Sequence, residues 1–235
     1  MIVAYHSIFS MYGFWLPNDP RGSGSDYIAS WELFRYGPAT KTDSRRSVAR
    51  RPLPPNWQRE AKTALLHPPV SVTGRQALAI SQGFAKAAGE GFYRIYACAI
   101  LPEHVHLVIG AHPRRIRQVV GHIRSRATRA AREQQLWDGD RPLWGEHGWN
   151  VYLESIAAVE RAIRYVNENP IKEGKKRQHW SFVVPFVARE ANQLAIAAEA
   201  ARAAKPARRI GGAALAASLA TRSKRQARGK RSPLK

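Results

Sequence analysis

Two histidines that stand two residues apart, His104 and His106, are the part of this sequence best suited to chemistry. They lie in the run LPEHVHLVI, residues 101–109, which is bounded and patterned like a β-strand. Successive side chains of a strand point to opposite faces, so both imidazoles should share one face while Val105, Leu107 and Ile109 point the other way, into a core. Such a pair could bind a metal ion through its ring nitrogens or donate to a phosphate.

A tyrosine and two polar residues share one face of a later predicted helix. The segment 155–169 has apolar residues at helical spacing, and Tyr165 lies just off that stripe, with Arg161 one turn before it and Asn169 one turn after it. Tyrosine is a poor nucleophile at its free pKa of about 10, so attack on phosphorus needs a nearby metal or cation. The histidine pair could hold that metal. Tyr152, in a strand-like stretch, is the alternative nucleophile.

The charge of the chain restricts its partners. Its 38 Lys and Arg against 17 Asp and Glu give a formal net charge of +21, which indicates a polyanion such as nucleic acid. An acidic membrane surface is the weaker competitor. Neither a membrane-spanning apolar run nor a signal peptide is recognisable, so we expect a cytoplasmic, nucleoid-associated protein. The single cysteine, Cys98, excludes a disulfide framework and a cysteine-based zinc site, and we expect it in the core.

The hydrophobic periodicity predicts four strands and three helices. The strands are expected at about residues 2–10, 92–100, 104–110 and 150–153, and the helices at 73–89, 114–136 and 155–169. The last helix should open with Ser155 as its N-cap and end before Pro170, because proline disfavours the α conformation in the preceding residue. The element order suits an α+β fold, a ferredoxin-like antiparallel β-sheet with helices packed on one face.

Two segments do not fit this pattern. Residues 19–69 are rich in Pro, Gly, Ser and Arg and predict a long irregular insertion in a domain that spans residues 1–186. Residues 187–235 form an Ala/Arg/Lys-rich basic tail, in which 202–235 hold eleven Lys or Arg and no acid. We expect this tail to be largely disordered, with helical turns where alanine dominates before Pro206.

Two separate motifs, taken in order, resemble a known family. The strand 101–109 and the segment 162–172, AIRYVNENPIK, flank a basic helix as in the single-tyrosine HUH transposases of insertion sequences. The REP-associated tyrosine transposases are the most similar branch, and the opening 5–22 also resembles the start of their chromosomal members. The resemblance covers roughly residues 1–172 without much of the insertion, although relatives often carry Asn where this chain has Glu103.

This resemblance implies a mechanism and its residues. Tyr165 matches the nucleophile, which attacks single-stranded or hairpin DNA to give a 5′-phosphotyrosine and a free 3′-hydroxyl. His104 and His106 match the histidines that bind a divalent cation, Mg²⁺ or Mn²⁺, and Asn169 matches the polar residue that completes the site. The implied activity is that of a metal-dependent transposase that nicks and rejoins DNA, and the extra segments favour a monomer over a homodimer.

Further residues are candidates for DNA contact. The basic face of helix 114–136 and the aromatic residues of the loop after the first strand suit phosphate contact and base stacking. The candidates are Tyr12, Trp15, Arg117, Arg124, Arg126 and Arg129.

Two other functions stay open. The chain could be a domesticated protein that binds DNA hairpins without cleaving them, or an RNA-binding ferredoxin-like module. The histidine pair supports strand transfer only if the later helix packs with Tyr165 toward it. Otherwise both imidazoles are ordinary polar side chains on a strand.

Overall fold

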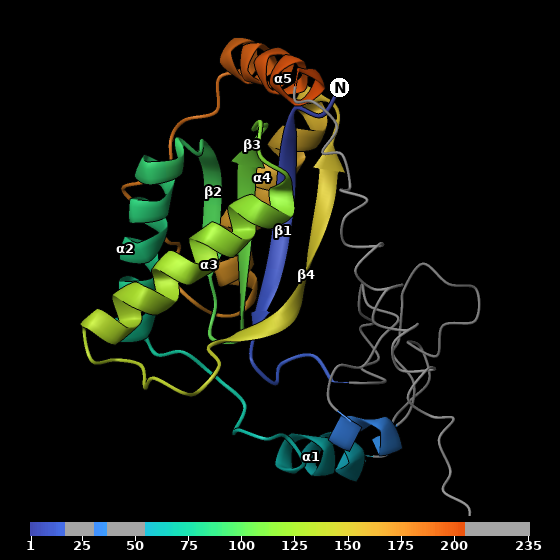
Figure 1. The fold of residues 1–235 in the computed structure, drawn as a ribbon, viewed down its shortest axis with the longest axis vertical. Helices are drawn as coiled ribbons and strands as arrows, with labels where there is room; N and C mark the ends of the chain where they lie inside the picture. The colour runs from blue at the N-terminus through green and yellow to red at the C-terminus, as the bar shows by residue number, and fades with distance from the viewer. Residues whose placement is uncertain (17–30, 37–54, 205–235) are drawn as a thin grey trace, which may run out of the picture. The chain divides into compact units, whose positions relative to one another are not determined.

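A computed structural model of the chain describes residues 1–16, 31–36 and 55–204. Four strands form one antiparallel sheet in the order β2-β3-β1-β4 (Figure 1). They are β1 (Ala4–Met11), β2 (Ile95–Ile100), β3 (His104–Gly110) and β4 (Trp144–Leu153). With the helix α2 (Gly74–Gly91) before β2 and the helix α3 (Ile116–Glu133) between β3 and β4, this strand order is that of a ferredoxin-like sheet, so the predicted α+β class is confirmed.

Two helices, α2 (Gly74–Gly91) and α3 (Ile116–Glu133), cover one face of the sheet. Thr73 begins α2 as a capping box, because its side chain accepts from the backbone of Gln76 while the Gln76 side chain accepts from the backbone of Thr73. The two helices approach closely at Gly83, where an added Cβ would lie 2.4 Å from Cα of Ala127. The main core lies between these helices and the sheet.

A third helix, α4 (Ile156–Lys172), lies on the other face of the sheet, behind it in Figure 1. The prediction that the helices pack on one face of the sheet holds for α2 and α3. Helix α4 packs on the opposite face and forms a second helical layer. Its apolar residues Val159, Ala162 and Val166 pack against small residues of the strands, including Ala4 and Ala97. Those small side chains let the helix approach the sheet, and the fold has a helical layer on each side.

The end of α4 differs from the prediction. Ser155 caps the helix as expected, accepting from the backbone of Ala158. The predicted end before Pro170 is wrong, because the helix runs through this buried residue to Lys172. A proline forgoes one helical hydrogen bond, and the loss is tolerated here since its ring is packed and its carbonyl accepts from Lys175. The turn that follows uses Gly174 at φ +68°.

A fourth packed helix corrects the predicted start of the tail at residue 187. The chain divides into two compact units, 1–202 and 203–235, and α5 (Ala188–Ala203) closes the first. Small side chains on one face of α5, Ala191, Ala195 and Ala198, are buried, and Arg202 donates to the hydroxyl of Tyr5 at 2.8 Å. An alanine-rich segment can therefore pack without large apolar residues. The expected disorder of 205–235 lies outside the described residues.

Part of the predicted irregular insertion is helical. The 3₁₀ helix η1 (Trp31–Tyr36) and helix α1 (Pro55–Thr63) share a small apolar cluster that includes Leu33 and Ala61. The rest of the insertion, 17–30 and 37–54, lies outside the described residues.

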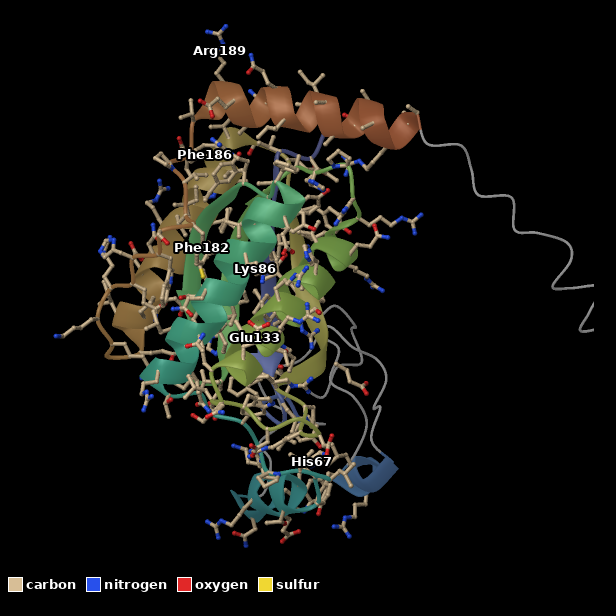
Figure 2. All side chains as sticks on the ribbon, turned by 60° about the vertical axis from the view of Figure 1, so that its left-hand side comes forward. His67, Lys86, Glu133, Phe182, Phe186 and Arg189 are labelled. Carbon is tan, nitrogen blue, oxygen red and sulfur yellow. The ribbon has the colours of Figure 1, made fainter. Side chains whose placement is uncertain are left out.

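The segment between α4 and α5 runs beside β2. Val184 donates to the carbonyl of Ile95 at 2.9 Å. Phe182 packs edge-on against Phe84, and Phe186 packs edge-on against Tyr96. Figure 2 labels Phe182 and Phe186. In the part of the chain that the structure describes, none of the helices combines the length and the apolar character that crossing a membrane requires.

Candidate active site

Strand β3 carries the histidine pair on the face that α4 covers. His106 is 4% exposed, and the two imidazole rings lie 4.9 Å apart between centroids. Val105, Leu107 and Ile109 are buried in the core on the opposite face, as the alternation predicts. The strand thus presents two ring-nitrogen groups to α4 and apolar groups to α2 and α3.

Helix α4 turns Tyr165 toward these imidazoles. The Tyr165 ring centroid lies 5.7 Å from that of His106, with the planes at 72°. The phenol side chain remains 45% exposed, so it is open to a large substrate. Since the strand and the helix are about sixty residues apart in the sequence, this contact is the tertiary condition on which the resemblance depends.

A third histidine, His6 of β1, joins the cluster. Its Nε2 lies 3.0 Å from Nδ1 of His106, and its ring centroid lies 5.8 Å from that of Tyr165. Burial lowers the pKa of His6 to about 4, and burial together with the charges of His104 and His6 lowers the pKa of His106 to about 3. Both rings are therefore neutral at pH 7, the state in which an imidazole binds metals.

No role for His6 was predicted from the sequence. The available signal was alternation in the first strand, which puts His6 on the face opposite Tyr5 and Phe9. The pairing of β1 with β3, which brings His6 beside His106, is a tertiary fact that alternation alone does not supply.

Asn169, one turn after Tyr165, fits a ligand role. The residue is 7% exposed, and its Nδ2 atom is buried without a hydrogen-bond partner. The two ends of an amide exchange on a 180° rotation, so the unpaired end can equally present Oδ1. Two imidazoles and one amide oxygen form a donor set that divalent cations accept. Among the described residues, no group of three or more His, Cys, Asp or Glu side chains is arranged to hold a metal.

Charged side chains of α4 and of the turn after it border this cluster. Nζ of Lys172 lies 5.0 Å from the Tyr165 ring centroid and 3.3 Å from a carboxylate oxygen of Glu168. Oε1 of Glu173 lies 3.7 Å from Nε2 of His104. The site therefore has a cation beside the phenol and a carboxylate beside the outer histidine.

Aromatic residues of the loop after β1 border the other part of the site. The Phe14 ring stacks on His104 with centroids 5.3 Å apart and planes at 12°. Trp15 meets Phe14 edge-on and is 37% exposed, so the structure places this predicted stacking residue close to the histidines. The other predicted aromatic, Tyr12, packs partly against the main core and lies edge-on to His67.

The arginines predicted to contact DNA lie on α3, on the opposite face of the sheet from the histidines. Arg124 donates to the carbonyls of Gly145 and Glu146, and burial lowers its pKa. Arg126 pairs with Glu90 at 2.7 Å. Arg117 and Arg129 are exposed. All four arginines thus lie apart from the histidine cluster, and Arg124 and Arg126 already bind partners within the protein.

Tyr152, the alternative nucleophile, also faces away from the histidines. It is exposed, and its ring lies 5.5 Å from that of Tyr5, which belongs to the α2 and α3 side of the sheet. Cys98 is buried in the same core, as predicted, and burial raises the pKa of its thiol.

Comparison with known proteins places this cluster in context. Residues 71–169 match the sequence model of the family described as "Transposase IS200 like", and this range includes both histidines, Tyr165 and Asn169. No curated protein matches the chain. A REP-associated tyrosine transposase, solved bound to a REP hairpin, is 13% identical over 73% of this chain and 68% of its own, with a TM-score of 0.41. A candidate transposase from Deinococcus radiodurans R1 is 13% identical over 74% of this chain and 92% of its own, with a TM-score of 0.33.

Proposed function

We propose that this chain, of which residues 71–169 match the model of the IS200-like transposases, nicks and rejoins single-stranded or hairpin DNA through Tyr165. One observation carries the proposal: α4 brings the Tyr165 ring to 5.7 Å from that of His106, on the only face of β3 that presents imidazoles in the described structure. A phenol beside neutral imidazoles, open to solvent, suits attack on a bulky phosphodiester.

His104, His106 and Asn169 would hold a divalent cation, Mg²⁺ or Mn²⁺. When bound, this cation supplies Lewis acidity that neutralises charge on the attacked phosphate. The contact with His6 occupies Nδ1 of His106 and leaves Nε2 as its ligand atom. His106 can bind a metal through Nε2 only if its proton lies on Nδ1 and is donated to Nε2 of His6. His6 therefore selects the tautomer of His106.

Tyr165 performs the covalent step in this proposal. Its hydroxyl oxygen forms a bond to phosphorus while the bond from phosphorus to the 3′ oxygen breaks, and the phenolic proton is lost as the 3′ oxygen gains one. The product is a 5′-phosphotyrosine and a free 3′-hydroxyl. The ammonium of Lys172, close to the ring, favours the approach of the anionic phosphate. Rejoining is the same exchange with a 3′-hydroxyl as the attacking group.

The remaining assignments are parts of the same proposal. Trp15 is the better placed of the two aromatic candidates for base stacking, since Tyr12 is partly packed in the core. Arg117 and Arg129 would contact duplex parts of a hairpin beyond the site, whereas Arg124 and Arg126 mainly fix α3 to its neighbours. We propose that the chain acts in the cytoplasm, on the nucleoid, as a monomer.

The decisive experiment measures a covalent protein–DNA product. End-labelled hairpins from imperfect palindromes flanking the gene are incubated with protein and Mn²⁺, and adducts are resolved by denaturing electrophoresis. We expect an adduct with the wild type and with Tyr152→Phe, and none with Tyr165→Phe. An adduct that persists in Tyr165→Phe would refute the assignment. Hairpin binding with no adduct in the wild type, unchanged by chelator, would support the non-cleaving alternative.

A further inference from the structure

The end of α4 and the turn after it carry a run of exposed cations that begins beside the candidate site. Residues 172–177, KEGKKR, hold four cations and one acid, and all six are exposed. We call this stretch the post-helix segment. Its acid, Glu173, lies 3.7 Å from His104, and its first cation, Lys172, lies 5.0 Å from the Tyr165 ring centroid. The segment therefore starts at the nucleophile, and its further cations are Lys175, Lys176 and Arg177.

The backbone of the post-helix segment is held at both ends. At its start, Gly174 and Lys175 donate to the carbonyls of Ile171 and Pro170 at 2.9 and 2.8 Å. At its end, the Gln178 side chain accepts from the backbone N–H of Ile100 at 2.8 Å and donates to the carbonyl of Ile100 at 2.7 Å. The segment is thus fixed between α4 and β2, and its cations keep a defined position relative to the site.

The aromatic loop after β1 and the post-helix segment meet at the same histidine. Phe14 stacks on His104 from the loop after β1, with the half-exposed Trp15 against it, and Glu173 of the post-helix segment contacts His104 by its carboxylate. Stacking surfaces combined with a row of cations are typical of sites for single-stranded nucleic acid, since unpaired bases stack while phosphates contact the cations. A duplex keeps its bases stacked internally and would leave the aromatic pair unused.

We infer that the post-helix segment binds the single strand of DNA that adjoins the scissile phosphate, with Phe14 and Trp15 stacking on the bases of the same strand. This inference rests on the proposed function and assigns the cleaved strand to the α4 face of the sheet. It gives the basic face of α3, across the sheet, no part in holding that strand.

The test measures equilibrium binding of a labelled single-stranded oligodeoxynucleotide by fluorescence anisotropy, without metal, over a range of salt concentrations. Lys175→Gln/Lys176→Gln should lower the salt slope by about 1.4, at about 0.7 per lost phosphate contact, and weaken binding on the order of tenfold at 0.1 M salt. Lys175→Arg/Lys176→Arg should restore both. The matched control, Arg75→Gln/Lys86→Gln, removes two exposed cations from α2 (Lys86 in Figure 2) and should retain wild-type binding.

Each outcome decides the inference without reference to cleavage. Equal losses in the α2 control and the post-helix variant would overturn it, since the effect would then follow net charge alone. An unchanged salt slope in Lys175→Gln/Lys176→Gln would also overturn it, as would a larger loss for a duplex or an RNA of the same length. The binding assay needs neither metal nor Tyr165. The post-helix segment can therefore be shown to bind DNA even if no covalent adduct forms, so failure of the inference and failure of the proposed function can be told apart.

Discussion

Nε2 of His6 and Nδ1 of His106 lie 3.0 Å apart, so one proton is shared between two buried imidazoles on neighbouring strands. The position of that proton decides whether His106 offers a lone pair at Nε2. Hydrogen-bond partners of this kind, which contact a ligand rather than a metal, fix the tautomer and the ring orientation of the ligand.

Replacing His6 should weaken metal binding. We expect His6→Ala to lower Mn²⁺ affinity by about 10- to 100-fold, because His106 loses the acceptor that keeps its proton on Nδ1. His6→Asn, which keeps a side-chain acceptor, should lose less. The measurement is a titration of free Mn²⁺ by electron paramagnetic resonance without DNA, with the exposed His179→Ala as control. Wild-type affinity in folded His6→Ala would contradict the role assigned to His6.

Stability should fall as the pH is lowered from about 6.5 toward 4. The pKa values of His6 and His106 are depressed to about 4 and about 3 in the folded protein, so the unfolded chain binds more protons in this interval. The free energy of unfolding then rises with pH through the interval, by at most about 1.4 kcal/mol per pH unit for each of the two histidines. Urea unfolding of the wild type and of His6→Asn/His106→Asn, at several pH values, measures it. A double variant with the wild-type pH dependence would show that other groups cause the loss.

Asn169 should separate metal binding from stability. Asn169→Leu removes a buried amide with an unpaired Nδ2, so we expect the free energy of unfolding to stay level or rise by about 1 kcal/mol. Mn²⁺ affinity should fall in the same variant because a ligand oxygen is lost, and Asn169→Asp should bind Mn²⁺ at least as well as the wild type. A large loss of stability in Asn169→Leu, with unchanged metal affinity, would make Asn169 a structural residue.

The close approach of α2 and α3 predicts opposite effects at two glycines of one helix. Gly83→Ala would place a Cβ 2.4 Å from Cα of Ala127, and we expect it to destabilise the protein by about 1 to 3 kcal/mol. An added Cβ at Gly89 meets nothing within 4 Å, so Gly89→Ala should stabilise by about 0.5 to 1 kcal/mol. Thermal unfolding of both variants measures the pair, and equal effects would mean that the helices do not touch at Gly83.

Local patterns were enough to predict most of the fold. Alternation in 101–109 predicted which residues of β3 enter the core, and helical spacing with Ser155 as N-cap predicted the start of α4. The end of α4 was missed because tertiary packing of Pro170 outweighs its local penalty. Helix α5 was missed because an alanine-rich stripe resembles low-complexity sequence until its packing partners are known.

The two motifs of the site could be recognised in the sequence, but which residues come together around them could not be fully predicted from it. His104, His106, Tyr165 and Asn169 could be named from spacing and resemblance, but their approach depends on which face of the sheet α4 covers. His6 has no motif of its own, and only the pairing of β1 with β3 gives it a partner. The arginines of α3 could be identified in the sequence, but their position could not be predicted. No local sequence pattern indicates that the sheet separates them from the histidines.

Strands β1 and β3 each serve both faces of the sheet, with Tyr5 and Val105 in one layer and His6 and His106 in the other. A single-residue insertion or deletion within either strand would exchange the two sets of side chains, so imidazoles would enter the apolar core and core residues would face α4. A change in the length of either strand should therefore destabilise the fold and abolish activity together. The site and the core share one register, so the lengths of these two strands must stay fixed together.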